Sequence, residues 1–236
     1  MSKKIKCFCA DDWGMSPSIN DGILELIDRE LIYSVSLMVT GEYVDYRLNE
    51  LLLAQAEKQV KLSLHFNLTY MLKHSSPGSL IFSWLLLSLK SEYVLDQFKK
   101  QINIAAAKKI RFDLLDGHHH VHLLPFVFKE IDAHAELLPV KQIRLMIDSD
   151  HWLSFVQTKL FKFMFKNRIK KWKIVECGYL QADDLASREI FMEKFNGYDL
   201  LIIHPAKYND FHQVVFNDKL KAARVDEYNK ILEYVV

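Results

Sequence analysis

The strongest constraint on the fold is an alternation of short apolar runs with stretches of helical periodicity along most of the 236-residue chain. Such alternation is typical of parallel βα units. Seven runs predict strands: Ile5–Ala10, Ser34–Val39, Val60–Leu64, Phe112–Leu115, Gln142–Ile147, Lys173–Glu176 and Asp199–Ile203. The sequence therefore predicts an α/β fold, a β/α barrel of about seven mainly parallel strands.

Helical patterns lie between these strands. Ile23, Leu24, Ile27 and Leu31 recur at helical spacing, a second pattern follows Pro125, and a third closes the chain from Lys219. The stretch 66–90 interrupts the alternation and contains a Ser-Ser-Pro-Gly turn signal, so we expect an insertion there, with a substrate lid as one interpretation. Neither a repeat nor a linker divides the sequence, which predicts one domain over residues 1–236.

Charge and cysteine content narrow the classes of partner. The formal net charge is +1 with 26% charged residues, which gives no overall field to attract nucleic acid or a membrane. The basic stretch Lys162–Lys173 is read as a solvated helix face rather than a membrane or RNA surface. Three cysteines suit free thiols in a reducing compartment, and residues 1–6 are not followed by a signal-peptide core. We expect a cytoplasmic protein.

Residues able to bind metal occur where the predicted strands end. Asp11 and Asp12 follow the first strand, His65 ends the third, the segment Asp116–His122 follows the fourth, and His204 ends the seventh. In a β/α barrel the carboxyl ends of the strands share one face, where catalytic groups gather. These distant residues are therefore expected to converge on one cavity.

The histidine cluster is the least ordinary of these features. His118, His119, His120 and His122 precede an apolar Leu-Leu-Pro segment, where a solvated loop would rarely concentrate imidazoles. Side chains alternate along an extended segment, so His118, His120 and His122 are expected to share one side. His65 and His204 each have an alternative interpretation as hydrogen-bonded core histidines. The residues alone do not decide which histidines bind the ion.

Four motifs in order resemble those of the YdjC-like carbohydrate deacetylases, over nearly the whole chain. They are Ala10–Ser16 with Asn20–Glu25, then Leu64–Thr69, Asp116–His122 and Ile203–Pro205. The resemblance implies a distorted β/α barrel that removes the acetyl group from N-acetylated sugars such as chitooligosaccharides with one divalent ion. It implies Asp12, His65 and His118 as the ligands of that ion.

The resemblance also implies roles for two further residues. Asp11 becomes the general base, and Arg144 lies where the family places an arginine near the substrate. A histidine must protonate the departing amine, and His204 is the first candidate. His122 is the second candidate and otherwise a substrate contact. Two imidazoles and one carboxylate leave coordination positions for water and a carbonyl oxygen on Mg²⁺ or Zn²⁺.

Two alternatives use the same residues. A metal-dependent phosphoesterase would share the His and Asp ligands, but it usually needs a second metal or a basic clamp. A non-catalytic sugar-binding protein would keep the barrel, although pure binding does not require Asp11 as a base. The expected partner is a small carbohydrate, and the sequence leaves a homodimer open.

Overall fold

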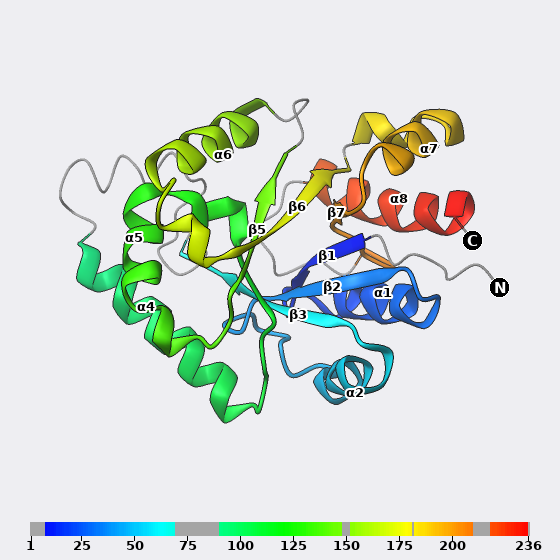
Figure 1. Ribbon diagram of the computed structural model, residues 1–236. Coiled ribbons are helices and arrows are strands. Elements are labelled where there is room, and N and C mark those ends of the chain that lie inside the picture. Colours follow the sequence, from blue (N-terminus) through cyan, green and yellow to red (C-terminus); the bar gives the residue numbers. More distant parts are fainter. Residues whose placement is uncertain (1–7, 69–89, 148–151, 181, 210–217, 236) are drawn as a thin grey trace. The chain divides into compact units, whose positions relative to one another are not determined.

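The computed structural model describes residues 8–68, 90–147, 152–180, 182–209 and 218–235 (Figure 1). Its seven strands are parallel and are ordered in sequence around a closed barrel, which confirms the predicted α/β barrel. They are β1 Phe8–Trp13, β2 Ile32–Leu37, β3 Lys61–Phe66, β4 Leu114–Gly117, β5 Gln142–Met146, β6 Lys173–Tyr179 and β7 Leu201–Ile203.

Helices follow most of the strands in sequence. The α-helices of the described residues are α1 Pro17–Asp28, α2 Leu48–Lys58, α4 Ser91–Ala107, α5 Pro125–Ala133, α6 Trp152–Met164, α7 Arg188–Gly197 and α8 Asp218–Val235. The 3-10 segments are η1 His118–Leu123, η2 Ala135–Leu137, η3 Ile169–Lys171 and η4 Ala182–Leu185. The helices predicted after the first and fourth strands and at the end of the chain are confirmed as α1, α5 and α8.

The chain divides into two compact units. The first comprises Met1–Leu37, Gly41–Leu62 and Cys177–Val236, and the second comprises Met38–Thr40 and Ser63–Glu176. In the first unit β1 pairs with β2 and β7, and β7 also pairs with β6. In the second, β4 pairs with β3 and β5.

Helix α1 in the first unit begins with a capping serine followed by a proline. Ser16 accepts a hydrogen bond from the backbone N–H of Ile19, and Pro17 occupies the first turn, where its missing N–H costs nothing. The apolar face of the helix includes Ile19, Ile23 and Ile27, all buried. Side-chain capping and burial of one apolar face together account for a helix of this length.

Asn20 on α1 joins two loops of the same unit. Its side-chain oxygen accepts from the N–H of Gly14 at 2.9 Å, and its amide nitrogen donates to the carbonyl oxygens of Tyr43 at 3.0 Å and Tyr46 at 2.9 Å. The side chain is fully buried. Because these bonds satisfy backbone groups that a buried loop would otherwise leave unpaired, they fix the loop that follows β1.

An aromatic cluster supports the second unit. The ring of Phe128 on α5 lies 4.6 Å from that of Phe161 and 4.7 Å from that of Phe165, with both pairs edge-on. Trp172 is 6.1 Å away. Edge-on pairs of this kind add about 0.5–1.5 kcal/mol each beyond the area they bury. The basic stretch 162–173 is not one helix, because α6 ends at Met164 and η3 follows.

The strand ends differ from those predicted. β1 continues through Asp11 and Asp12 to Trp13, β3 continues through His65 to Phe66, and β4 includes Asp116. These polar residues were predicted to end or follow strands because they interrupt apolar runs, but here their side chains are buried against partners. Residues 5–7 of the first predicted strand and most of the predicted insertion, residues 69–89, lie outside the described residues.

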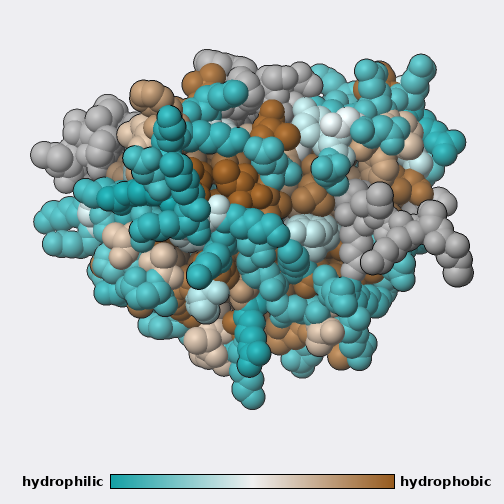
Figure 2. All heavy atoms as spheres, viewed as in Figure 1, coloured by the Kyte–Doolittle hydropathy of each residue, from teal (hydrophilic) through white to brown (hydrophobic). Residues whose placement is uncertain are grey.

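The remaining surface and core features agree with the composition. Cys9 and Cys177 are buried free thiols, with their sulfur atoms 3.7 Å apart. Figure 2 shows hydrophilic residues over much of one face of the molecule, with hydrophobic residues exposed between them. Among the described residues, the helices all fall short of the length and apolar character that crossing a membrane requires.

Candidate metal and catalytic site

Asp11 and Asp12 lie at an irregularity in β1. Between Ala10 and Trp13 the strand advances three residues while β2 advances two, from Val35 to Leu37, so β1 carries one extra residue there. Asp12 has a left-handed backbone with φ 71°, which Asp tolerates better than most residues. The bulge breaks the strict alternation of side chains. Consecutive carboxylates therefore need not point to opposite faces of the strand.

Asp12 is paired with an arginine from α8. The Nη2 atom of Arg224 donates to Oδ2 of Asp12 at 2.6 Å, and both side chains are buried. A buried carboxylate requires such compensation, because an unpaired charge in the interior is costly. A charge-assisted bond of this length is strong and restricts the orientation of the carboxylate.

His204 follows β7 directly and is anchored through its backbone. Its N–H donates to Oε1 of Glu227 on α8, and its ring centroid lies 5.3 Å from that of Tyr179. Burial raises the pKa of Tyr179 above its ordinary range, and Glu227 adds to that effect. The phenol therefore keeps its proton at neutral pH.

The buried carboxyl group of Glu227 has a strongly raised pKa. Burial raises its pKa to about 8 against the lowering effects of the His204 N–H and of Arg224, and the nearby charge of Asp11 raises it further. Glu227 is thus mostly protonated at neutral pH. It accepts the backbone N–H of His204 without placing a second full negative charge beside Asp11.

In the second unit, His65 and Asp116 form a hydrogen-bonded pair. They are neighbours across β3 and β4, and Nδ1 of His65 lies 2.6 Å from Oδ1 of Asp116. The other carboxylate oxygen lies 3.3 Å from Nη1 of Arg144. Because a carboxylate only accepts, Nδ1 carries the proton, and in the neutral ring Nε2 then presents its lone pair. This is the usual arrangement of a metal-binding histidine.

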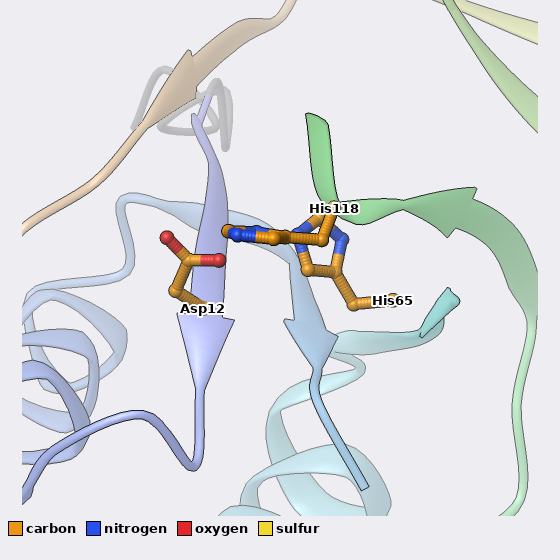
Figure 3. Close-up of side chains that lie close together, drawn as sticks. All are labelled: Asp12, His65 and His118. Atoms are coloured by element: carbon orange, nitrogen blue, oxygen red, sulfur yellow. The ribbon is translucent and has the colours of Figure 1, made fainter. Parts of the chain in front are cut away.

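The histidine cluster is not extended, which corrects the prediction for His118, His120 and His122. These residues belong to η1, and His119 and His120 have left-handed backbones with φ of 51° and 55°. The turn buries His118 and His122 but leaves His119 exposed and His120 half-buried. The ring of His118 lies edge-on to that of His65, with centroids 5.5 Å apart (Figure 3).

His122 is held against the backbone. Its Nε2 donates to the carbonyl oxygen of Arg144 at 2.9 Å, and its Nδ1 has no hydrogen-bond partner among the described residues. A side chain at Gly117 would meet this nitrogen at 3.0 Å, so the glycine leaves room for the ring. Burial lowers the pKa of His122 to about 4. A neutral ring that donates to the backbone is poorly suited to be the proton donor.

Asp12, His65 and His118 could hold a metal ion. All three are buried, and each offers one ligand atom within 4.8 Å of the others (Figure 3). Asp11, His65 and Asp116 form a second group by the same measure. Two imidazoles and a carboxylate suit a divalent ion of the zinc type, and the carboxylate behind His65 completes the usual outer contact.

The structure brings some predicted residues together and adds others. Arg144 contacts Asp116, and its role toward a substrate stays a prediction, as does that of His204. Sequence reasoning assigned no function to Arg224 or Glu227. One signal was present: Arg224, Glu227, Tyr228 and Ile231 share a buried face of α8, and charged residues on an apolar face need a specific partner.

The fold and site define an α/β barrel with a buried Asp and His cluster suited to a metal ion. The family model described as YdjC-like protein matches residues 7–234, so the chain belongs to the YdjC-like family. A chitooligosaccharide deacetylase of Proteus mirabilis (strain HI4320) is 26% identical over 156 residues, which span 60% of each chain.

A solved structure shares the fold. It is a crystal structure of an Enterococcus faecalis V583 protein provisionally described as a cellobiose-phosphate cleavage protein. The two chains have a TM-score of 0.65 and 17% identity, and the match covers 98% of this chain and 94% of the other. At this identity the likeness establishes the fold alone.

Proposed function

We propose that this protein is a metal-dependent carbohydrate deacetylase that removes the N-acetyl group from an amino sugar or a short chitooligosaccharide. The observation that carries the proposal is the group of Asp12, His65 and His118, with Asp116 behind His65. The family and the deacetylase relative supply the substrate class.

The ion, Mg²⁺ or Zn²⁺, would be held by Asp12, His65 and His118. When bound there it would polarise the amide carbonyl oxygen and stabilise the negative charge that develops on it. Asp116 would keep the proton on Nδ1 of His65 and so keep Nε2 available as a ligand. Arg144 compensates the charge of Asp116 in a site where both side chains are buried.

Asp11 and His204 would move the protons. A water molecule adds its oxygen to the acetyl carbon while Asp11 takes its proton. The carbon–nitrogen bond then breaks, and His204 gives a proton to the departing amine, which leaves acetate and a free amino sugar. The neutral Glu227 behind His204 would hold the backbone from which this imidazole extends.

The phosphoesterase alternative is less consistent with the charges at the site. The positive charge of each arginine described there is compensated by a carboxylate, Arg144 by Asp116 and Arg224 by Asp12. Phosphate recognition usually relies on arginines whose positive charge is available to the ligand. Inhibition by inorganic phosphate would be the sign of that alternative.

Acetate release tests the proposal. Metal-stripped protein would be given N-acetylglucosamine, its disaccharide or its 6-phosphate, with Mg²⁺, Zn²⁺, Co²⁺ or no ion. Metal-dependent release of acetate supports the proposal and ranks the substrates. Silence across the panel from protein that binds the ion would reject deacetylation of these sugars and favour a binding protein.

A further inference from the structure

Helix α8 contacts the ends of two strands through one of its faces. Arg224 bonds to Asp12 on β1 through its guanidinium, and its carbonyl oxygen accepts from the N–H of Ala206 at 3.2 Å. Glu227 accepts from the N–H of His204. Residues three apart on a helix are neighbours, so one turn of α8 supports both the carboxylate and the loop after β7.

The hydrogen bond from Arg224 limits how the carboxylate of Asp12 can bind a metal ion. The Nη2 atom of the guanidinium is 2.6 Å from Oδ2, so this contact involves one of the two carboxylate oxygens. A carboxylate that is released from such a bond can turn or present both oxygens to an ion. The positive charge of Arg224 also repels a nearby cation. The arginine therefore lowers the affinity for the ion while it fixes the orientation of the Asp12 carboxylate.

Glu227 acts on the backbone rather than on a side chain. His204, Pro205 and Ala206 leave β7 as a loop, and the bonds to Glu227 and to the Arg224 carbonyl fix two of its N–H groups. Proline offers no N–H of its own. The direction of the His204 imidazole therefore depends on an acceptor at position 227.

We propose that Arg224 and Glu227 are positioning residues of the site. Arg224 restricts Asp12 to one oxygen toward the metal ion, and Glu227 orients His204 through its backbone. This inference rests on the proposed function for its effect on turnover, but each half also has a readout that does not need turnover.

For Arg224, the decisive measurement is the affinity for Co²⁺ by titration calorimetry. Arg224→Met removes the guanidinium contact at Oδ2 of Asp12 and a positive charge that repels the ion. We therefore expect about tenfold tighter Co²⁺ binding together with at least tenfold lower kcat. Arg224→Lys should recover part of both effects. Lys230→Met, on an exposed part of α8, is the matched control and should change neither.

For Glu227, the readout is the imidazole of His204 in the metal-free protein. Glu227→Ala removes the acceptor, so we expect a shifted NMR titration of His204 and about a tenfold loss of kcat, with Co²⁺ affinity unchanged. Glu227→Gln keeps an acceptor oxygen and should stay within about threefold of wild-type kcat. The neighbouring exposed carboxylate gives the control Asp226→Asn.

The outcomes separate the two ideas. Wild-type protein that binds Co²⁺ but releases no acetate would reject the proposed function, while the affinity and the His204 titration still decide the inference. Weaker Co²⁺ binding in Arg224→Met than in wild type would overturn the role of Arg224, as would a wild type that binds no ion. An unchanged His204 titration in Glu227→Ala would overturn the role of Glu227. Thermal melts establish that each variant is folded, and Arg224→Lys decides if Arg224→Met is not.

Discussion

A buried carboxylate is paired with an arginine at two places, Asp12 with Arg224 and Asp116 with Arg144. In both pairs one oxygen of the carboxylate contacts the arginine. The other oxygen of Asp116 contacts His65. Asp11 lies close enough to Glu227 for its charge to help raise the pKa of that carboxyl group to about 8. The role of Asp11 as the carboxylate that exchanges protons is a prediction.

Replacing Asp11 tests that assignment. Asp11→Asn keeps the shape of the side chain but cannot take a proton, so we expect deacetylation to fall by about 10²–10⁴-fold with unchanged metal content. Acetate release and elemental analysis of the same preparation check both parts. Turnover at the wild-type rate would exclude Asp11 as the base.

The lowered pKa of His122 predicts that the protein is less stable in acid. Its pKa falls from 6.5 to about 4 on folding because of burial, so the unfolded chain binds more protons between these values. The free energy of unfolding should therefore decrease as the pH falls from 6.5 to 4, by up to about 3 kcal/mol. Urea unfolding at pH 7 and pH 4.5 measures the difference.

The variant His122→Gln separates the contribution of His122 from that of other groups that titrate between pH 7 and pH 4.5. In His122→Gln the side chain can still donate to the Arg144 carbonyl but does not titrate, so the loss of stability between pH 7 and pH 4.5 should be smaller than in wild type. His134→Gln, at a partly exposed histidine, is the control. Equal losses in wild type and His122→Gln would show that His122 contributes nothing to acid sensitivity.

At the scale of elements, the packing of β6 beside Tyr198 depends on a glycine, Gly178. A Cβ at Gly178 would lie 2.6 to 2.9 Å from the ring of Tyr198. We expect Gly178→Ala to lower the free energy of unfolding by about 1–3 kcal/mol, because overpacking moves the ring or the strand. Gly197→Ala, where a Cβ meets nothing within 4 Å, is the control for urea unfolding. Equal stabilities would mean that Tyr198 adapts freely.

The elements were predictable because their patterns are local. Seven apolar runs gave seven strands, and Pro125 marked the start of α5. Strand ends were not predictable at Asp11, His65 and Asp116, since partners distant in sequence make it favourable to bury these polar groups. The turn at His119 and His120 was missed for a similar reason: left-handed backbones at non-glycine residues leave no composition signal.

The site was predictable where its residues are metal-binding types that stand out from an apolar surrounding sequence. Aspartates and histidines in apolar surroundings draw attention in a sequence, and Asp12, His65 and His118 are brought together as a group able to bind an ion. Arg224 and Glu227 belong to an ordinary charged helix pattern, and only their buried contacts reveal them.

At the scale of the whole molecule, an ion bound only by the folded chain adds to its stability. Co²⁺ at a concentration about 100 times its dissociation constant should raise the free energy of unfolding by about 2.7 kcal/mol. His65→Ala should lose most of this increase, whereas His134→Ala should keep it. Thermal melts with and without the ion provide the measurement. An equal increase in both variants would place the ion elsewhere.

The bulge in β1 also has a consequence for transplanting this chemistry. Ala10 to Trp13 contains one residue more than the facing stretch of β2, and the left-handed backbone of Asp12 belongs to that extra length. Copying two aspartates into a regular strand of another barrel would send one of them to the wrong side. A designer would have to graft the irregular stretch of backbone with the side chains, and deleting a single residue here would take the pair apart.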